Sequence, residues 1–387
     1  MTLVEAAWDD ARVAAYGCGA LLPTEHVQLA DADRRVLADV VVANTALPAF
    51  ATSAMDGWAV CGNGPWQVIG EVLAGTTRSE RLRPGEAVGI ATGAAIPEGS
   101  LAVLRREGGS WTDEGTLSGT VVQGQHIRPA GEEATSGHVL IEAGTVLTPA
   151  HLGLAAAGGA DLLEVVAVPT AEVLVLGDEL LESGFSRDGR VRDSLGPQIP
   201  GWLTRLGVRS RAVTRVEDTL AAHVSSLEGV EECQLIVTTG GTAGGPVDYL
   251  HDAIDAVGGR LVVDSVAVRP GHPMLLAQLG EHRWLLGLPG NPQSAIVALL
   301  SLGVPLLAAL NGRAFPELPR TSLGEDASAP PGETRLLLCA QLGDVVMPTS
   351  HLGSAMLRGL AVSDGFAVIP PGGAPRGTSV RWLPLPP

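Results

Sequence analysis

Apolar runs and helical segments alternate along the second half of the chain. From Ala171 onward, four continuous apolar runs have the length and composition of buried strands: EVLVLG, CQLIVTT, RLVVDSVAV and RWLLGL. Segments with helical spacing of apolar residues separate them, for example GPQIPGWLTRLG and DTLAAHVSSLE. This alternation predicts a doubly wound α/β domain with a parallel sheet, and the ligand site of such a domain lies at the carboxyl ends of the strands.

The last helix of this domain has a defined start and stop. Asn291 and Pro292 supply an N-cap followed by proline at the first helical position, and Asn311-Gly312 is a typical stop. After FPELP, Pro and Gly breaks resume. We therefore predict that residues 169–314 form the α/β domain and residues 315–387 a C-terminal β domain.

The first part of the chain has a different pattern. A helical pattern extends to about Val42, is clearest in DADRRVLADVVVA, and ends by Pro48. Residues 51–125 contain short segments such as WQVIGEVLAG and EAVGIATGA, divided by Gly and Pro. They predict a small β domain inserted in an N-terminal mixed α/β domain, which residues 1–50 and 126–168 form. The predicted fold class is α/β multidomain.

The composition limits which classes of binding partner are expected. The chain has 387 residues, 45% of them hydrophobic, which is enough for two to four domains. Its net charge of −17 argues against a nucleic-acid partner, because a phosphate backbone requires a basic surface. An anionic small substrate would need local help from a divalent metal, from a few arginines or from helix N-termini.

The cysteines and the N-terminus bear on the compartment. Cys18, Cys61, Cys233 and Cys339 are far apart and form no C-x-x-C pair, so neither a disulfide framework nor a zinc site is indicated. The start of the chain is acidic where a signal peptide would be basic, and we expect no membrane-spanning run. These observations predict a cytoplasmic protein without a membrane partner.

A glycine loop follows one of the predicted strands. The stretch CQLIVTTGGTAGGPVDYL leads from an apolar run through four glycines toward a helix. It lacks the Lys-Ser/Thr of a P-loop, and G-x-G-x-x-G is absent. Glycines that allow close backbone approach, followed by free N–H groups, outline an anion site. The alternative is a glycine-rich turn needed only for strand-to-helix geometry.

Carboxylates cluster in the loops of the same domain. Asp178 and Glu179 in LGDEL directly follow a strand, and the glycine loop ends in Asp248. Asp193 and Ser194 in VRDSLGP stand at a predicted helix start, where an N-cap is the alternative role. Acidic side chains beside an anion loop are typical of a magnesium-dependent phosphate site. Solvated surface carboxylates are the alternative in so acidic a chain.

Two proline-framed turns complete the candidate chemistry. VRPGHPM and LPGNPQS place prolines around glycine, which fixes the backbone and can present N–H groups or side chains rigidly. The alternative is that these prolines only stabilise turns.

Taken together, the loop motifs resemble one family, that of the molybdopterin molybdenumtransferases, which includes MoeA and the gephyrin E domain. The shared order is TSAMDGWAV, IRPAGEEA, LTPAHLGL, GDEL, RDSLGP, TTGGTAGGPVDY, VRPGHP and GLPGNPQSA, and SHLGSAMLRGLAVSDGFAVIP fits the same pattern. The resemblance implies an elongated homodimer with four domains per subunit, among them an α/β molybdopterin-binding domain. It implies Mg²⁺-dependent insertion of molybdate into adenylylated molybdopterin with release of AMP.

The resemblance also carries site roles onto this chain. The implied catalytic residues are Asp56, Asp178, Glu179, Asp248 and His272, with Glu179 and Asp248 as magnesium ligands. The implied substrate-binding residues are Asp193, Ser194, Asp218, Gly240, Gly241, Arg269, Pro270, Pro273, Pro289, Asn291, Pro292 and Ser294. Asp56 would reach the cleft from the partner subunit. The molybdopterin adenylyltransferase and acceptor molybdoenzymes are further implied partners.

Several positions depart from the family pattern. The glycine loop has Thr242, Ala243 and Pro246 where the family has Val, Ser and an acidic residue. Leu176, Leu195, Ala51 and Thr52 replace Thr, Asn, Asp and Asn, and His272 replaces a lysine near the oxyanion site. These losses favour a second hypothesis, a paralogue that binds pterin, cofactor or a protein without inserting metal. Sugar or phosphoryl transfer is a third possibility, for which no kinase or P-loop motif is present.

The lysine-to-histidine departure predicts a pH dependence. A lysine stays charged well above neutrality, whereas an unperturbed histidine loses its charge near pH 6.5, so anion attraction at His272 should fade as the pH rises through about that value. The alternative is that His272 only fills its turn.

The resemblance predicts a stable homodimer whose interface borders the cleft. Asp56 is far in sequence from the α/β loops, and the family pattern joins them across subunits. Analytical ultracentrifugation at micromolar concentration should show a dimer. A monomer would contradict the prediction.

Overall fold

The computed structural model describes residues 2–230, 233–245 and 248–387, and its contacts divide the chain into two units. Unit 1 contains the residues up to Glu25 and then Val166–Pro387, and unit 2 is His26–Val165. Unit 2 is therefore inserted in unit 1. The predicted N-terminal domain of residues 1–50 differs from this division, because residues up to Glu25 belong to unit 1. The remaining predicted domain boundaries stay a prediction.

A seven-stranded sheet forms the centre of unit 1. Its strand order is β1-β19-β21-β22-β18-β14-β17. The bounds are β1 Leu3–Ala6, β14 Thr170–Leu176, β17 Arg209–Val216, β18 Leu235–Thr239, β19 Arg260–Val266, β21 Leu275–Gly280 and β22 Arg283–Leu288. Every strand except β21 runs in the same direction. The four predicted apolar runs are the strands β14, β18, β19 and β22, and the predicted parallel sheet differs only by the reversed β21.

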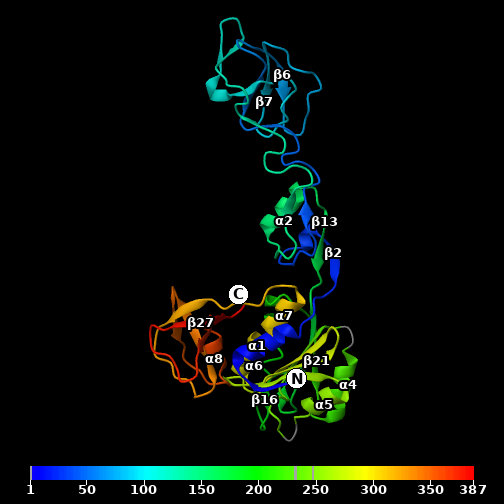
Figure 1. Cartoon of the computed structure of the whole chain (residues 1–387), viewed down its shortest axis with the longest axis vertical. Helices are drawn as coiled ribbons and strands as arrows, with labels where there is room; N and C mark the ends of the chain where they lie inside the picture. The colour runs from blue at the N-terminus through cyan, green and yellow to red at the C-terminus, as the bar shows by residue number, and fades with distance from the viewer. Residues whose placement is uncertain (1, 231–232, 246–247) are drawn as a thin grey trace. The chain divides into compact units, whose positions relative to one another are not determined.

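Helices cover both faces of this sheet. The helices α4 and α5 lie together on one side of β21, and α1, α6 and α7 lie together on the other (Figure 1). The bounds of the helices of unit 1 are α1 Trp8–Gly17, α3 Ile199–Arg205, α4 Leu220–Gly229, α5 Leu250–Ala256, α6 Pro292–Ala298, α7 Val304–Leu310 and α8 Leu357–Leu360. Apolar residues of α4 and α5, including Leu227 and Ile254, form one core with Leu174 and Ile236 of the sheet. The arrangement is the predicted doubly wound one.

The helix predicted from Asn291 is confirmed. Asn291 is the N-cap of α6, Pro292 is its first residue, and a π-helical segment, Leu299–Gly303, joins it to α7, which is capped by Asn311. The expectation of no membrane-length run needs correction, because the 19 residues of Pro292–Leu310 are long and apolar enough to cross a membrane. Of the most apolar stretch, 83% is buried inside the structure, as in a core helix.

The C-terminal part of unit 1 is a small closed β structure. Strand β24 pairs with both β25 and β26, and the pairings β26–β27, β27–β23 and β23–β25 complete a ring. The bounds are β23 Arg320–Leu323, β24 Thr334–Leu342, β25 Val345–Pro348, β26 Gly365–Ile369 and β27 Ser379–Pro384. Ring closure leaves few free strand edges. A sixth strand, β20 (Val268–Arg269), comes from the α/β part and pairs with β24.

Unit 2 has several separate hydrophobic clusters. Two of them pack around the four-stranded sheet β6-β7-β5-β8, which is formed by β5 Gly57–Val60, β6 Gln67–Val72, β7 Glu86–Ile90 and β8 Ala102–Arg105. A further cluster surrounds Leu37, Ile141 and Leu163 and includes residues of the helix α2, Pro149–Ala157. The short strand pairs are β3 Val41–Val42 with β12 Val139–Ile141, β4 Thr52–Ser53 with β11 Ile127–Arg128, β9 Ser110–Trp111 with β10 Leu117–Ser118, and β2 Thr24–Gln28 with β13 Leu162–Val166.

The predicted helix in DADRRVLADVVVA is wrong. The segment contains the end of a 3-10 turn, Leu29–Asp31, and the strand β3, while Val36 and Leu37 bridge to Val146 and Val165. Its apolar residues are buried through pairing with a distant segment, and this pairing overrides the local helical spacing. The helix of the N-terminal region is instead α1, whose first residue Trp8 is fully buried.

The burial of Trp8 generates a stability prediction. Its Nε1 donates a hydrogen bond of 2.8 Å to Oγ of Ser301, which is also fully buried. The variant Trp8→Phe should lower the free energy of unfolding by about 1–3 kcal/mol, because it leaves the Ser301 hydroxyl without this partner. The measurement is urea unfolding followed by fluorescence of the other tryptophans.

Two further variants test the cause of that loss. Tyr16→Phe removes an exposed hydrogen bond to the Arg313 carbonyl and should cost less. Adding Ser301→Ala to Trp8→Phe should recover part of the stability, since both polar partners are then gone. If the double variant is less stable than Trp8→Phe, the loss comes from packing and not from the unpaired hydroxyl.

Candidate functional site

The parallel strands of unit 1 bring several predicted site residues to one edge of the sheet. Because β14, β17, β18 and β22 are neighbours and run in one direction, their carboxyl ends lie at the same edge. The residues that follow these four strands there are Asp178 and Glu179, Asp218, Gly240 and Gly241, and Pro289 and Asn291. The parallel strands therefore bring these predicted site residues to one edge, and their role in ligand binding stays a prediction.

The turn that carries Asp178 is tied to the neighbouring strand. The backbone N–H of Asp178 donates to Oδ2 of Asp218 at 3.0 Å. Nη2 of Arg215 donates to the carbonyl oxygens of Gly177 and Leu180 at 3.2 and 2.9 Å. Asp218 thus binds the backbone of the turn, and Arg215, which was not predicted, binds two of its carbonyls.

The glycine loop has a backbone that needs glycine. Gly240 and Gly241 have φ values of 89° and 70°, which L side chains rarely adopt. A Cβ at Gly241 would lie 2.9 Å from Cδ1 of Leu176. The Gly240 N–H donates to the Leu288 carbonyl at 2.8 Å, and the Asp248 carboxylate accepts from the Gly245 N–H at 2.7 Å. The loop is therefore held on β22 at one end and by Asp248 at the other.

A buried histidine lies close to this loop and was not predicted. His223 of α4 is 2% exposed, and neither of its ring nitrogens has a hydrogen-bond partner among the described residues. Burial lowers its pKa, while the charges of Asp218 and Asp248 act to raise it. Both carboxylates therefore lie near one imidazole. The sequence offered no signal for His223, because a single histidine in an amphipathic helix has no distinctive spacing.

Two hydroxyls at the base of the loop were also missed. The side chains of Thr238 and Thr239 are buried, and their hydroxyls have no partner among the described residues. Unpaired buried hydroxyls are uncommon and call for an explanation. The TT pair before the glycines was the available signal, but a threonine in a strand usually reads as β-propensity alone.

Asp193 and Ser194 join the Asp178 turn through a short strand pair. The strands β15 (Leu180–Leu181) and β16 (Val191–Arg192) pair in parallel, and the Asp193 N–H donates to the Leu181 carbonyl at 3.0 Å. Oδ1 of Asp193 accepts from the N–H groups of Leu195 and Gly196. The predicted helix start needs correction, because α3 begins at Ile199 with Gln198 at its N-cap. Asp193 therefore stabilises a loop and is not the N-cap of α3.

The two proline-framed turns line one cavity of about 300 Å³. Its lining includes Arg269, Pro270, Gly271, His272 and Pro273 from the first turn and Pro289, Asn291 and Ser294 from the second. The remaining wall belongs to the C-terminal part and includes Arg335, Leu352 and Ser354. Strand β20 brings the first turn to this wall through its pairing with β24. Pro292 starts α6 directly beside the second turn and is buried.

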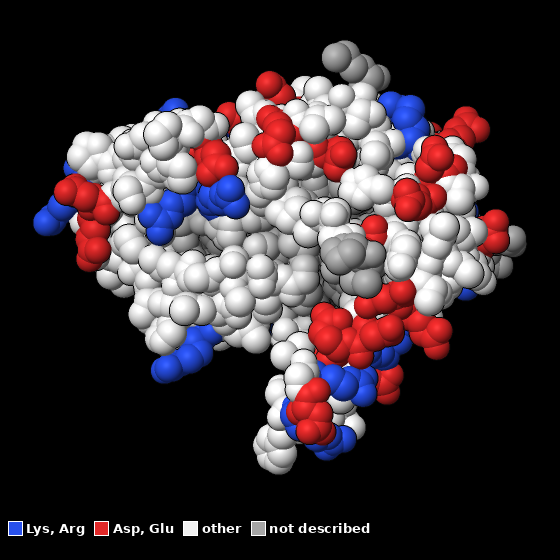
Figure 2. Space-filling view, turned by 90° about the horizontal axis from the view of Figure 1, so that it is seen from below, with Lys and Arg blue, Asp and Glu red and all other residues white. Residues whose placement is uncertain are grey.

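Arginines supply the fixed positive charge of this cavity. Nε of Arg269 lies 3.1 Å from Oε2 of Glu333, and Nη1 of Arg335 donates to the Ser328 carbonyl at 2.8 Å. On the face in Figure 2, acidic side chains gather mostly on the right and along the top, and basic side chains lie at the edge of a hollow on the left. Arg335 and Ser354 were missed because ETRLLL reads as an ordinary strand and LGSAM as a loop.

Asp56 lies in unit 2, directly before β5. Its carboxylate accepts from the N–H and the hydroxyl of Thr92, at 2.7 and 3.1 Å. These two hydrogen bonds, the backbone one first, lower the pKa of Asp56 and keep the carboxylate ionised. Its predicted meeting with the cleft of a partner subunit stays a prediction.

The departures from the family pattern lie partly in the core. Leu176 and Leu195 are both 5% exposed, and Leu176 packs with Leu174, Ile236 and Leu250. Both positions therefore provide apolar packing beneath the loops instead of polar contacts. Thr242 is buried, and Pro246 lies outside the described residues.

The described residues form no cluster of three or more His, Cys, Asp or Glu side chains able to hold a metal. The predicted ligands Glu179 and Asp248 therefore do not belong to a preassembled cage. Magnesium usually binds proteins through one or two carboxylates together with substrate phosphates and water. Hard oxygen donors at the edge that carries the glycine loop fit that kind of site.

Three family models match successive parts of the chain. They are "MoeA N-terminal region (domain I and II)" over residues 4–159, "Probable molybdopterin binding domain" over residues 172–309, and "MoeA C-terminal region (domain IV)" over residues 320–385. Together the matches extend over nearly the whole chain.

Curated relatives carry one name. The molybdopterin molybdenumtransferase of Haemophilus influenzae is 32% identical over 299 residues, which cover 75% of this chain and 74% of the relative. The Bacillus subtilis protein of the same name is 29% identical over 385 residues, covering 93% and 89%. The crystal structure of the molybdopterin biosynthesis MoeA protein from Pyrococcus horikoshii shares the fold, with a TM-score of 0.82, 23% identity and 98% coverage of both chains.

The backbone of the glycine loop generates a further stability prediction. Gly241→Ala should destabilise the protein by more than about 1 kcal/mol, because alanine there adopts a left-handed backbone and also meets Leu176. The matched control is Gly244→Ala, since Gly244 has a similar φ of 69° and open space around it. Unfolding midpoints in urea should fall further for Gly241→Ala. Equal midpoints would show that the Leu176 contact costs nothing.

Proposed function

The chain belongs to the MoeA family of molybdopterin molybdenumtransferases, a family of transferase enzymes of molybdenum cofactor biosynthesis, and from that premise we propose that it inserts molybdate into adenylylated molybdopterin with release of AMP, assisted by Mg²⁺. The observation that carries the proposal is the cavity between the two proline-framed turns and the C-terminal wall. It lies beside the sheet edge that holds the glycine loop, because Pro289 and Asn291 belong to both.

The cavity suits molybdate as a substrate. Its volume of about 300 Å³ accommodates a small tetrahedral oxyanion together with part of a larger ligand. Arg269 and Arg335 supply permanent positive charge, and the side chains of Asn291, Ser294 and Ser354 supply neutral hydrogen-bond donors. In a chain with a net charge of −17, such a local group of cations decides where an anion binds.

The glycine loop suits the phosphate end of the pterin. Gly240 and Gly241 present backbone without side chains, so an anionic group can approach the loop and the Gly241 N–H closely, while the Gly240 N–H stays bound to the Leu288 carbonyl. Asp178, Glu179 and Asp248 follow β14 and β18 at the same edge. Of these, Glu179 and Asp248 would hold Mg²⁺, which when bound neutralises phosphate charge and orients the leaving AMP.

The other proposed site residues support these two parts. Asp218 orients the Asp178 turn, and Asp193 shapes the adjoining loop that carries Ser194. Pro270, Pro273 and Pro292 stiffen the turns around the cavity. We further propose that the protein works as a cytoplasmic homodimer in which Asp56 completes the partner's cleft. The molybdopterin adenylyltransferase and acceptor molybdoenzymes are its proposed partners.

A second candidate function is a pterin-binding or scaffold protein that does not insert metal. The burial of Leu176 and Leu195 favours it, because apolar side chains stand where the family pattern has polar ones. Both leucines pack beneath the loops, whereas the GDEL carboxylates and Asp248 are retained. We therefore place the transferase first.

One experiment separates the two functions. Purified protein is incubated with adenylylated molybdopterin, molybdate and Mg²⁺, and AMP is followed by chromatography. Molybdate-dependent AMP release, which stops when a chelator removes Mg²⁺, supports the transferase. Retention of the pterin without AMP release above the protein-free control would support the binding protein instead.

Asp248 provides a prediction about ligand binding. The variant Asp248→Asn should weaken Mg²⁺-dependent binding of the adenylylated pterin by at least about ten-fold, and binding of a non-phosphorylated pterin much less. Asparagine can still accept the hydrogen bond from the Gly245 N–H, so the loop stays closed while a hard anionic ligand is lost. Isothermal titration with each pterin, with and without Mg²⁺, gives both affinities.

The matched control is Asp252→Asn on the exposed side of α5. It removes the same charge four residues away and should leave both affinities within about two-fold, as expected for a screened surface charge. Equal losses for the two pterins in Asp248→Asn would assign Asp248 a purely structural role.

A further inference from the structure

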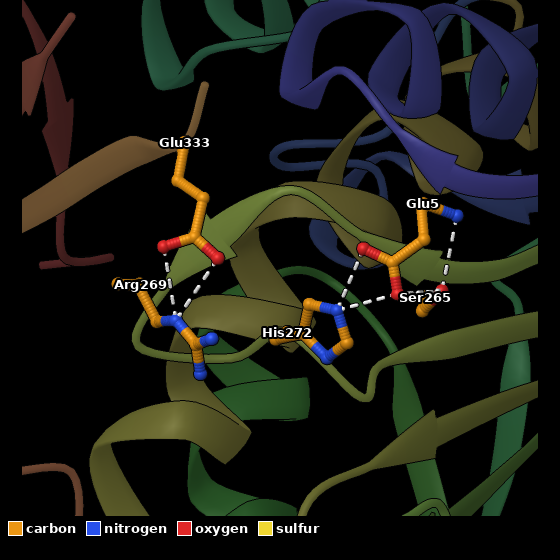
Figure 3. Close-up of polar contacts among 5 residues, drawn as sticks. All are labelled: Glu5, Ser265, Arg269, His272 and Glu333. Atoms are coloured by element: carbon orange, nitrogen blue, oxygen red, sulfur yellow. Dashed lines mark hydrogen bonds and ion pairs between the residues drawn. The ribbon is translucent and has the colours of Figure 1, made fainter. Parts of the chain in front are cut away.

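The histidine of the first proline-framed turn is bound to a carboxylate from the other end of the chain. Nε2 of His272 lies 2.7 and 2.9 Å from the two carboxylate oxygens of Glu5 (Figure 3). Glu5 belongs to β1, and 267 positions separate the two residues. His272 lines the cavity, and its second ring nitrogen, Nδ1, is on the side of the ring away from Glu5 (Figure 3).

The backbone around Glu5 is shaped to deliver this contact. Glu5 and Ser265 have φ values of 49° and 70°, which are unusual for residues other than glycine. They lie opposite each other, between the ladder pairs Val4–Asp264 and Ala6–Val266. Ser265 Oγ accepts from the Glu5 N–H at 3.0 Å and donates to Oε1 of Glu5 at 3.3 Å. Strained backbone of this kind is typical of places where a side chain must be held in one direction. Here it occurs at both Glu5 and Ser265, which share the Ser265 hydroxyl.

The turn that carries His272 is fixed to the same place. The N–H groups of Ser265 and Val266 donate to the carbonyls of Met274 and His272 at 3.1 and 3.0 Å. Hydrogen bonds thus join the Ser265–Val266 segment to Glu5 on one side and to the His272 turn on the other, which fixes the backbones of Glu5 and His272 next to each other.

Charged groups beside His272 come from several parts of the chain. Glu5 comes from β1, and Arg269 comes from β20. Glu333, the partner of Arg269, directly precedes β24, and Arg335 of β24 lines the same cavity as His272. The hydrogen bond from His272 is the largest cause that lowers the pKa of Glu5 below its usual 4.5. Because this pKa is lowered, Glu5 stays ionised above about pH 4.5. A change in anion binding at higher pH therefore comes from the titration of another group.

We propose that Glu5 is a positioning residue that holds Nε2–H of His272, so that the protonated ring presents Nδ1–H to the oxyanion substrate in the cavity. The proposal rests on the proposed function for the identity of that oxyanion as molybdate. With Nε2–H bound to Glu5, a neutral ring would direct the bare lone pair of Nδ1 at the substrate and repel it. Only the imidazolium donates at both nitrogens, so oxyanion binding takes up a proton at Nδ1.

The test measures molybdate binding from about pH 5.5 to 8.5, a range that spans the pKa of about 6.5 of an unperturbed histidine. In the wild type, affinity should fall as the pH rises. In Glu5→Gln the midpoint of that fall should change, because the carboxylate that holds Nε2–H is gone. His272→Lys should flatten the curve.

Two controls separate positioning from general damage. Glu333→Gln alters the partner of Arg269 at the same cavity and should change affinity without moving the midpoint, because arginine does not titrate in this range. In a His272→Gln background, Glu5→Gln should have no further effect on the pH profile.

A spectroscopic arm needs no molybdate. In ¹⁵N-labelled protein, the imidazole signals of His272, assigned by their loss in His272→Gln, should show a proton on Nε2 across the pH range. In Glu5→Gln these imidazole signals should change, because the carboxylate that accepts from Nε2–H is gone. Unchanged signals together with an unchanged binding midpoint in Glu5→Gln would overturn the inference. Failure of the wild type to bind molybdate at any pH would overturn the proposed function, while the His272 signals still report whether Glu5 sets the ring.

Discussion

The pairing of β1 with β19 is the interaction on which the rest of unit 1 depends. Leu3, Val4 and Ala6 pair with Val263, Asp264 and Val266, so the first residues of the chain become the edge of a sheet built otherwise from residues after Thr170. This pairing encloses unit 2 as an insertion. It also sets α1 against the apolar helix that follows β22, where Trp8 reaches Ser301. Without β1, α1 would lose its attachment to that face of the sheet, and the partner of His272 would be missing.

The cavity exists because three distant segments are fixed to one another. The first proline-framed turn is held by β20, whose pairing with β24 extends the closed ring of the C-terminal part. The second turn leads into α6, and Gln293 at its start donates to the carbonyls of His351 and Met356. Gln293 is 1% exposed, so these two hydrogen bonds are shielded from water. The segment that carries Leu352 and Ser354 is therefore held over the cavity by the same turn that lines it.

The sequence predicted what depends on local pattern and missed what depends on distant pairing. The strands β14, β18 and β22 and the helix from Pro292 are continuous apolar elements with clear ends, and the structure has them. The segment from Asp31 to Ala43 has a helical spacing, yet Val36 and Leu37 bridge to partners more than a hundred residues away. The motifs identified the two turns, the glycine loop and the carboxylates. They gave no sign of Glu5, Arg335 or His223, whose roles follow from contacts between segments that are remote in the sequence.

The balance of charge at the cavity explains why a histidine can stand in a turn where the family pattern has lysine. Arg269 is paired with Glu333, so part of its charge is already compensated. Arg335 is bound to the uncharged Ser328, and no ion pair joins it to another described residue. The net positive charge offered to an anion therefore depends on Arg335 and on the proton that His272 carries. A lysine opposite Glu5 would form a permanent ion pair. A histidine held by the same carboxylate carries its second proton when an anion in the cavity stabilises it, so the charge of the cavity depends on the anion. Glu5 and His272 thus act as one proton-dependent unit, and the fixed charge of Arg335 is what remains when that proton leaves.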